Sequence, residues 1–275
     1  MKIAVTGGSG RVGRGVVELA LAQGHQVVNI DRVSPAGVTD QPNLTHIQAD
    51  ITDYDALVNA FRGCDAVIHL AAIPAPGHLP DHVVHNNNVT GSYNALRAAV
   101  EVGVQRICQA SSVNATGLAY SRWPRFDYFP LDEQHPTYCE DPYALSKWIC
   151  EEQASSIARR YETLTIASLR FHGVTPQRPS LAQIAAYRNP DTVIKNLWAY
   201  TSLAAAARAC LLSLTANFTG HEVFYIVAPD TIMDTPSLEL QQKHFPGVPL
   251  RGDLSGHNSF FDSSKAGRLL GWKHN

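Results

Sequence analysis

The chain has 275 residues, of which 45% are hydrophobic and 17% charged, and its formal net charge at pH 7 is -2. This length suffices for one large α/β domain or for a domain with a smaller lobe, and the absence of a basic excess argues against nucleic-acid binding. No run approaches the roughly 18 apolar residues of a membrane span. The five cysteines are scattered, without a C-x-x-C pair, which favours a reducing compartment. Because the first residues already resemble a strand, we expect no signal peptide and a cytoplasmic protein with neither nucleic-acid nor membrane partners.

Short β-branched runs alternate along the chain with longer segments of helical period. The expected strands are residues 2–6, 26–30, 44–48, 66–70, 104–110, 163–170 and 223–227. The expected helices are residues 11–23, 53–61, 88–102, 142–161, 202–215 and 263–270. Several strands are continuous apolar runs, as in strands covered on both faces. This alternation predicts an α/β fold with a Rossmann-type, doubly wound parallel sheet.

The first strand runs into a glycine-rich turn, Thr6-Gly7-Gly8-Ser9-Gly10-Arg11-Val12-Gly13. Its glycines fit both the G-x-G-x-x-G and the G-x-x-G-x-x-G spacing. Glycine permits a tight turn and a close approach of the backbone to a pyrophosphate, which the free N–H groups of the following helix then face. Because the turn follows a strand and opens a helix, it predicts a dinucleotide site.

Two acidic positions follow the second and third strands. Asp31 comes 18 residues after Gly13, where a carboxylate binds the adenosine ribose and disfavours a 2′-phosphate, so NAD is expected. Arg32 leaves NADP open, because a guanidinium can accept that phosphate. Alternatively, Asp31 is a plain turn residue at the end of its strand. Asp50-Ile51 either flanks the adenine or belongs to the N-cap of the helix at Asp53.

Tyr143 and Lys147 lie four residues apart at the start of an expected helix, on one face. A lysine ammonium beside a phenol lowers the pKa of the phenol, which makes Tyr143 a candidate general acid and base. Upstream, the strand at 104–110 runs into Ser111-Ser112-Val113-Asn114. These side chains are therefore expected at the carboxyl edge of the sheet, where open α/β sheets bind ligands.

The motifs occur in the chain order of a known family, together with His69-Leu70-Ala71-Ala72, Asn88-Val89-Thr90-Gly91 and Leu169-Arg170-Phe171. The chain resembles the extended short-chain dehydrogenase/reductase family, in its NAD-dependent epimerase/dehydratase branch. The resemblance covers about the first 175 residues and resumes weakly at 220–227 and 264–272. It implies that Tyr143 exchanges a proton with the substrate and that Lys147 holds the nicotinamide ribose. It also implies that Ser112 orients the substrate, with Ser111 as the alternative hydroxyl.

The resemblance further implies a set of residues around the cofactor, with Asn88 close to it. The set is Gly7, Gly10, Arg11, Val12, Gly13, Asp31, Arg32, Asp50, Ile51, Leu70, Ala71, Ala72, Asn88, Tyr143 and Lys147. Candidate substrate contacts are Ser111, Asn114, Arg122 and His172.

The chain departs from the family after the sixth strand. Members that act on nucleotide sugars usually have Leu-Arg-x-x-Asn-Val-Tyr-Gly-Pro there, whereas this chain has Leu169-Arg170-Phe171-His172-Gly173-Val174-Thr175-Pro176-Gln177. Gly173 thus replaces the asparagine that contacts the diphosphate, and the chain is shorter than such enzymes usually are. Both differences imply a smaller substrate without a nucleotide, as in the compact uronate dehydrogenases.

Two loops, 73–82 and 118–135, are expected to shape the pocket. In the second, Arg122 and Arg125 stand among Tyr120, Trp123 and other aromatic residues, an arrangement that clamps a carboxylate. The alternative is a loop anchored by its own aromatic side chains, with solvated arginines. The nearby histidines at 78, 82 and 85 have no second ligand set, so no metal site is expected.

We therefore expect residues 1–170 to form the NAD-binding domain and residues 171–275 a small substrate lobe that returns one strand, near 223–227, to the main sheet. The leading hypothesis is an NAD-dependent oxidoreductase acting on a secondary alcohol or ketone of a small sugar or sugar acid. The alternatives are an epimerase or dehydratase that retains NAD, and a non-catalytic dinucleotide-binding sensor. The resemblance also implies a homodimer through helices 88–102 and 142–161. In that dimer the interface would include Ala95, Ala98, Ala99, Trp148 and Ile149, and the alternative is that these residues are core.

Overall fold

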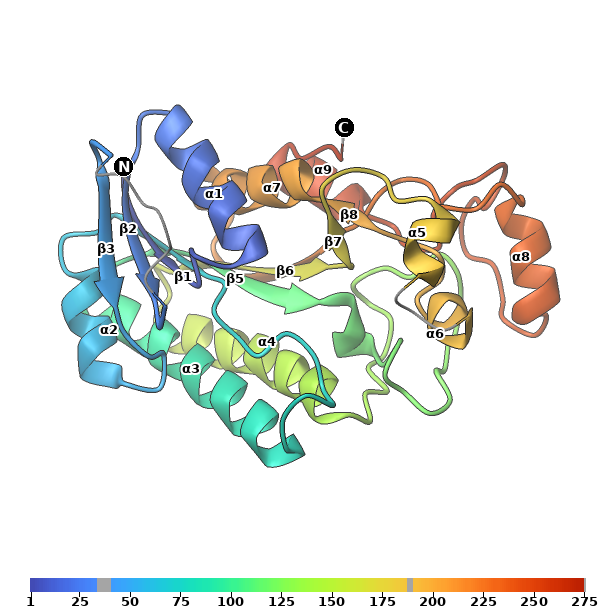
Figure 1. Cartoon of the computed structure of the whole chain (residues 1–275), viewed down its shortest axis with the longest axis horizontal. Helices are drawn as coiled ribbons and strands as arrows, with labels where there is room; N and C mark the ends of the chain where they lie inside the picture. Colours follow the sequence, from blue (N-terminus) through green and yellow to red (C-terminus); the bar gives the residue numbers. More distant parts are fainter. Residues whose placement is uncertain (34–40, 187–189, 275) are drawn as a thin grey trace.

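The computed structural model describes residues 1–33, 41–186 and 190–274. Seven parallel strands form one sheet in the order β3-β2-β1-β4-β5-β6-β9, which confirms the Rossmann-type α/β fold (Figure 1). The strands are β1 Lys2–Thr6, β2 Gln26–Asp31, β3 Leu44–Gln48, β4 Ala66–His69, β5 Arg106–Ser112, β6 Thr165–Phe171 and β9 Gly220–Ile226. The order reverses between β1 and β4, and this reversal opens a crevice at the carboxyl ends of the strands.

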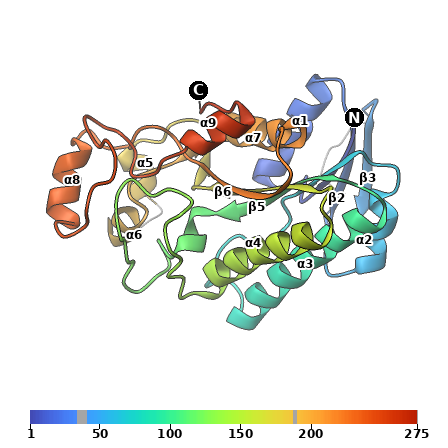
Figure 2. The ribbon, with the colours of Figure 1, turned by 180° about the vertical axis from the view of Figure 1, so that it is seen from behind.

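Helices cover both faces of this sheet. One face carries α1 (Arg11–Ala22), α7 (Leu203–Thr215) and α9 (Ser264–Leu270), and the other carries α2 (Tyr54–Phe61), α3 (Asp81–Glu101) and α4 (Pro142–Arg160) (Figures 1 and 2). Alternate residues of β1 face the two layers: Ile3 and Val5 pack under α1 and α7, and Ala4 packs under α2 and α3. Because β1, β4 and β6 are covered on both faces, they are the apolar runs that the sequence shows, whereas three of the five residues of the edge strand β3 are exposed.

Two of the helices begin directly after an aspartate that caps them, whereas a third begins earlier than the sequence predicts. The Asp53 side chain caps α2 by accepting a hydrogen bond from Ala56 N, and the Asp141 side chain caps α4 by accepting from Tyr143 N and Ala144 N. Helix α3 begins at Asp81 rather than at the expected Asn88. Asn88 has the polar side chain of a typical helix cap, but it lies in the interior of α3 with its amide buried and hydrogen-bonded.

A smaller lobe lies at one end of the sheet, beyond the carboxyl ends of β5 and β6 (Figure 1). It contains α5 (Leu181–Ala185), α6 (Pro190–Lys195), α8 (Ser237–His244) and the short pair β7 (Val174–Thr175) and β8 (Thr201–Ser202). The lobe packs around its own aromatic core, which includes Phe129, Trp198 and Phe260. The strand expected near 223–227 is present as β9, parallel to β6. No described helix is long and apolar enough to cross a membrane.

Candidate active site

A cleft of about 1110 Å³ runs along the carboxyl edge of the sheet. Its walls come from the glycine-rich turn, the ends of β2, β5 and β6, the segment after β4 and the start of α4. The expected channel residues Leu70, Ala71 and Ala72 are among the residues that line it. The structure thus brings the glycine turn and the Tyr143–Lys147 pair to one continuous surface.

The glycine turn is shaped so that only glycine fits at its tightest points. Gly7 has a φ of +71°, and a Cβ there would lie 2.7 Å from Ala71 N. A Cβ on Gly13 would lie 2.1 Å from the carbonyl oxygen of Gly7. No side chain caps the N-terminus of α1, whose N-cap is Gly10, so the N–H groups of its first turn are available to an anion. The turn therefore fits the pyrophosphate of a dinucleotide.

Asp31 lies at the end of β2 with its carboxylate held in place by backbone groups. Oδ2 accepts a hydrogen bond from Ser9 N at 3.1 Å, and Oδ1 accepts one from Val33 N at 3.3 Å. Both Asp31 and Arg32 line the cleft, so the acidic group and the guanidinium relevant to NAD and NADP are side by side. The structure fits an adenosine ribose at this end.

The structure distinguishes Asp50 from Asp53, for which the sequence suggested either an adenine contact or a helix cap. Asp53 is the N-cap of α2. Asp50 accepts hydrogen bonds from the backbone N–H and the hydroxyl of Thr52, and it lies 3.8 Å from Arg32 Nη1. The Thr52 N–H contributes most to holding the pKa of Asp50 below its usual value, with smaller contributions from the Thr52 hydroxyl and from Arg32. Ile51 lines the cleft, whereas Asp50 is not among the described residues that line it.

Tyr143 and Lys147 are both buried at the start of α4. Lys147 Nζ donates a hydrogen bond to the carbonyl oxygen of Ala110 at 2.8 Å and lies 6.0 Å from the centre of the Tyr143 ring. Burial raises the pKa of Tyr143, and its hydrogen bond with Ser112 acts in the opposite direction. Burial lowers the pKa of Lys147, while Cys150 and Glu151 oppose that change. In the chain alone the pKa of Tyr143 is therefore raised rather than lowered as expected, because desolvation of the phenol is the largest contribution.

Ser112 ends β5 next to Tyr143 and belongs to a short chain of polar groups. Its Oγ accepts hydrogen bonds from Asn114 N at 3.1 Å and from Asn114 Nδ2 at 3.3 Å. Asn114 Oδ1 in turn accepts from Ala119 N at 3.0 Å, which fixes the start of the loop that carries Tyr120. The ring of Tyr120 stands edge-on to that of Tyr143, with centroids 6.0 Å apart. Ser112, Asn114, Tyr120 and Tyr143 all line the cleft.

Three of the candidate site residues have other contacts than the sequence suggested. The Ser111 hydroxyl donates to Glu151 Oε1 at 2.5 Å, so it is tied to α4. Asn88 holds the backbone N–H and carbonyl of Ile73 and donates to Ser146, and its neighbour Asn87 lines the cleft instead.

The third of these candidates, Arg122, belongs to the long loop 118–135. It is exposed and is not among the described residues that line the cleft. Its backbone N–H donates to Glu140, and among the loop's polar and aromatic side chains it is Tyr120 that lines the cleft. The expected carboxylate clamp is therefore not formed by Arg122.

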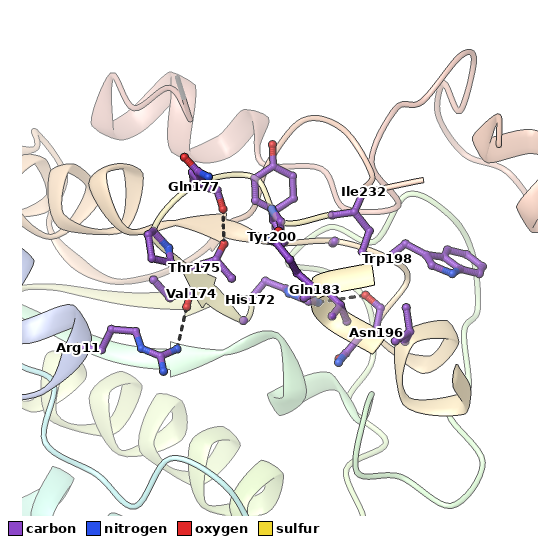
Figure 3. Close-up of a pocket in the computed structure, with 16 residues that line it drawn as sticks. Arg11, His172, Val174, Thr175, Gln177, Gln183, Asn196, Trp198, Tyr200 and Ile232 are labelled. Atoms are coloured by element: carbon purple, nitrogen blue, oxygen red, sulfur yellow. Dashed lines mark hydrogen bonds between the residues drawn. The ribbon is translucent and has the colours of Figure 1, made fainter. Parts of the chain in front are cut away.

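His172 lies between the cleft and a second, smaller cavity of about 550 Å³ inside the lobe. Figure 3 shows the His172 imidazole beside the backbone of Asn196, where Nε2 and the Asn196 carbonyl oxygen are 3.0 Å apart. The two cavities share Arg11, His172, Gly173, Val174 and Asn196.

Sequence reasoning missed several residues that line the cleft, and their signals differ. Gly8 and Ser9 belong to the glycine turn and were within reach of its motif. Val174 stands in the segment compared with the nucleotide-sugar motif, whereas Asn29 and Asn196 belong to no motif and reach the cleft only through the fold. Within the described parts of the chain, no group of three or more His, Cys, Asp or Glu side chains is placed to hold a metal ion.

The expected dimer face divides into buried and exposed parts. Ala95, Ala98 and Ala99 are buried in the core of the single chain, so the interpretation of these alanines as interface is wrong. Helices α3 and α4 pack on each other, and Tyr93 and Trp148 are exposed, at 46% and 37%.

Comparison with known proteins identifies the family of the chain. The family model described as the NAD dependent epimerase/dehydratase family matches residues 3–188. The L-arabinose 1-dehydrogenase (NAD(P)(+)) of Haloferax volcanii is 40% identical over 111 residues, which are 40% of this chain and 41% of that protein. The UDP-glucose 4-epimerase of Bacillus subtilis is 27% identical over 231 residues, 79% of this chain and 65% of that protein. The matches thus span less than two thirds of the length of either relative.

A solved structure described as a mutated uronate dehydrogenase superposes with a TM-score of 0.73 at 22% identity, covering 100% of this chain and 81% of that one. At this identity the likeness shows the shared fold. Together, the family model, the strand order and the geometry of the glycine turn lead to one conclusion. The chain belongs to the NAD-dependent epimerase/dehydratase family.

Proposed function

We propose that the protein is an NAD-dependent dehydrogenase that interconverts a secondary alcohol and a carbonyl group on a small sugar-like substrate. The observation that carries this proposal is the convergence of Ser112, Tyr143 and Lys147 at one end of a cleft whose other end is the glycine turn. The L-arabinose dehydrogenase among the relatives supports it. NADP remains open as a second dinucleotide, because Arg32 lies beside Asp31 in the cleft.

The residues of this chain fit a dinucleotide along the whole cleft. The glycine turn would hold the pyrophosphate, Asp31 the adenosine ribose and Lys147 the second ribose. When bound, the dinucleotide supplies the hydride acceptor or donor. Tyr143 would hold the substrate oxygen and exchange its proton, while Ser112, already hydrogen-bonded to Asn114, orients that oxygen. Because burial keeps the Tyr143 phenol protonated, the chain by itself is set to donate a proton.

The two parts of the chain would divide this work. Residues 1–170 would bind the dinucleotide and residues 171–275 would supply the substrate lobe. Within the second part, α7, β9 and α9 pack on the main sheet, so the substrate-binding elements are those between β6 and α7 and around α8. We also propose that Tyr93 and Trp148 on α3 and α4 pair across a homodimer, which their exposure supports.

The second candidate is an epimerase that keeps its NAD bound, and the longer match to UDP-glucose 4-epimerase favours it. Denaturing the purified protein and identifying any released nucleotide by mass separates the two. We expect protein without nucleotide that binds added NAD reversibly. Stoichiometric NAD released only on denaturation would contradict the dehydrogenase and favour the epimerase.

The role of Tyr143 is tested by Tyr143→Phe, which removes the exchanging hydroxyl and keeps the ring. We expect kcat to fall by about 10²- to 10⁴-fold with NAD affinity retained. The matched control is Tyr93→Phe on the exposed face of α3, which should keep full activity. Turnover within a few-fold of the original chain in Tyr143→Phe would refute the assignment.

A further inference from the structure

Apart from Lys147, which is assigned to the ribose of the dinucleotide, the catalytic end of the cleft offers neutral hydrogen-bonding groups to a substrate. Ser112, Asn114, Tyr120 and Tyr143 line it from β5, the following loop and α4, and Asn196 lines it from the lobe. Hydroxyls, phenols and amides both donate and accept hydrogen bonds. They match the hydroxyl groups of a sugar, which do the same.

The smaller cavity continues this chemistry away from Tyr143. Besides Arg11 and His172, its polar lining has amides and a hydroxyl from Thr175, Gln177, Gln183 and Asn196, and Trp198 and Tyr200 are also among the residues that line it (Figure 3). Its volume of about 550 Å³ is within the range of small-ligand pockets. Because it shares His172 and Asn196 with the cleft, a substrate held at Tyr143 can extend into it.

Three cations in the described part of the surrounding lobe are engaged with protein groups. Arg125 pairs with Asp127 at 3.0 Å, and Arg178 pairs with Asp230 at 3.0 Å. Lys195 Nζ donates to two backbone carbonyl oxygens, at 2.9 and 3.2 Å. None of these three cations is among the described residues that line either cavity.

Arg11 is the cation that the described lining of the small cavity contains. Its Nη1 donates to the Val174 carbonyl oxygen at 3.1 Å, as Figure 3 shows. Arg11 is also the first residue of α1, directly after the glycine turn. We therefore expect the guanidinium to pair with the phosphates of a bound dinucleotide rather than with the substrate.

These observations indicate which substrates the site can desolvate. A carboxylate or phosphate that leaves water requires a cation or several N–H donors in its place, whereas a hydroxyl requires only one neutral partner. We propose that the substrate is a neutral sugar, with its reacting carbon at Tyr143 and its far end in the small cavity, and that sugar acids and sugar phosphates are disfavoured. This inference rests on the proposed dehydrogenase function and narrows its substrate class.

The reaction on such a substrate is balanced by groups already assigned. The C–H bond of the carbinol carbon breaks and its hydride passes to the oxidised nicotinamide dinucleotide, while the hydroxyl proton passes to the phenolate of Tyr143, which has first released its own proton to water. The C–O bond becomes a carbonyl double bond. The products are the lactone or ketone, the reduced dinucleotide and one proton.

The substrate class is tested with matched sugars that differ at one carbon. D-glucose, D-glucuronate and D-glucose 6-phosphate form one set, and D-galactose and D-galacturonate form another. We expect kcat/KM, measured by formation of NADH, to favour the neutral member of each set by at least about tenfold. An equal or higher kcat/KM for the charged member would overturn the proposal.

Calorimetric binding of the same sugars to the NADH-loaded protein gives a readout that does not depend on turnover. If the neutral sugars bind more tightly than their charged partners but none is oxidised, the dehydrogenase function is refuted and the substrate class stands. If the charged sugars bind as tightly or more tightly, the substrate class is refuted.

The place of the far end is tested by changing one charge in the small cavity. Gln177 lines it from an exposed position, so Gln177→Arg and Gln177→Glu leave the core unchanged. We expect Gln177→Arg to raise the kcat/KM of D-galacturonate relative to D-galactose by about fivefold, and Gln177→Glu to lower it similarly, through KM. Gln242→Arg, on exposed α8 and outside the described lining of both cavities, is the matched control and should leave the ratio unchanged. An unchanged ratio in both Gln177 variants would refute this placement.

Discussion

The ion pair between Glu151 and Arg170 is the interaction whose removal should cost the fold most. Its side chains are only 4% and 5% exposed. Arg170 donates to the two carboxylate oxygens of Glu151 at 2.9 and 2.8 Å, and the Ser111 hydroxyl donates to the same carboxylate at 2.5 Å. Arg170 also donates to the Tyr225 hydroxyl at 3.3 Å. One buried network thus joins α4 to β5, β6 and β9.

Arg170→Met removes the cation and leaves the Glu151 carboxylate buried with Ser111 as its partner. Breaking a buried pair from one side costs about 3–5 kcal/mol, a large part of the roughly 5–15 kcal/mol that stabilises a typical domain. The free energy of unfolding, from urea denaturation followed by circular dichroism, should fall by that amount. The double variant Glu151→Leu/Arg170→Met leaves no buried charge and should recover at least half of the loss.

The matched control is Arg125→Met, because Arg125 forms an ion pair of similar length whose arginine is 65% exposed. Its loss should change the free energy of unfolding by less than about 1 kcal/mol. The reasoning would be refuted if Arg170→Met also cost less than about 1 kcal/mol. It would equally be refuted if the double variant lost as much as the two single variants together.

Three further outcomes follow from other parts of the molecule. Gly13→Ala places a Cβ 2.1 Å from the Gly7 carbonyl oxygen, so NAD affinity in a calorimetric titration should fall at least about tenfold. The control Gly247→Ala, at a position with open space around it, should leave NAD affinity unchanged. Equal affinities of the two variants would show that the turn tolerates a side chain. Burial lowers the pKa of His221 to about 4, so the unfolded chain, with a histidine pKa of about 6.5, binds more protons in between, and stability should decrease by roughly 2–3 kcal/mol as the pH falls from 6.5 to 4. His221→Gln should flatten that part of the pH profile of urea unfolding, and an identical profile would contradict the assignment. Light scattering should give twice the mass of one chain and Trp148→Asp should give the mass of one, while a monomeric original chain would rule out the dimer.

The fold was predictable because its central strands are buried on both faces. Strands such as β1, β4 and β6 are short, largely apolar runs, and the positions of these runs locate the sheet even where their ends shift by a few residues. The lobe was not predictable in the same way. Its helices α5 and α6 are only 5 and 6 residues long, and β7 and β8 have 2 residues each, so neither gives a periodic signal.

The candidate site shows the same division between local and tertiary information. Tyr143 and Lys147 were found because four residues make one turn of a helix, which is local. The choice between Ser111 and Ser112 depends on which hydroxyl Glu151 binds, and Glu151 is 40 residues away. The pKa of Tyr143 depends on its burial, which is also tertiary. Tyr120 belongs to a loop that the sequence already indicated as part of the pocket, whereas Asn196 reaches the cleft from a segment with no motif, so only the structure could identify it.

The hydrogen bond from Arg11 to Val174 links two parts of the molecule that are 163 residues apart in the chain. One end belongs to the turn proposed to hold phosphates, and the other is the first residue of β7 in the lobe. A dinucleotide whose phosphates attract the Arg11 guanidinium would break its hydrogen bond to the Val174 carbonyl oxygen, and this would change the free energy of sugar binding in the small cavity. Thermodynamic linkage makes such a coupling reciprocal: whatever factor the dinucleotide applies to sugar affinity, the sugar applies to dinucleotide affinity.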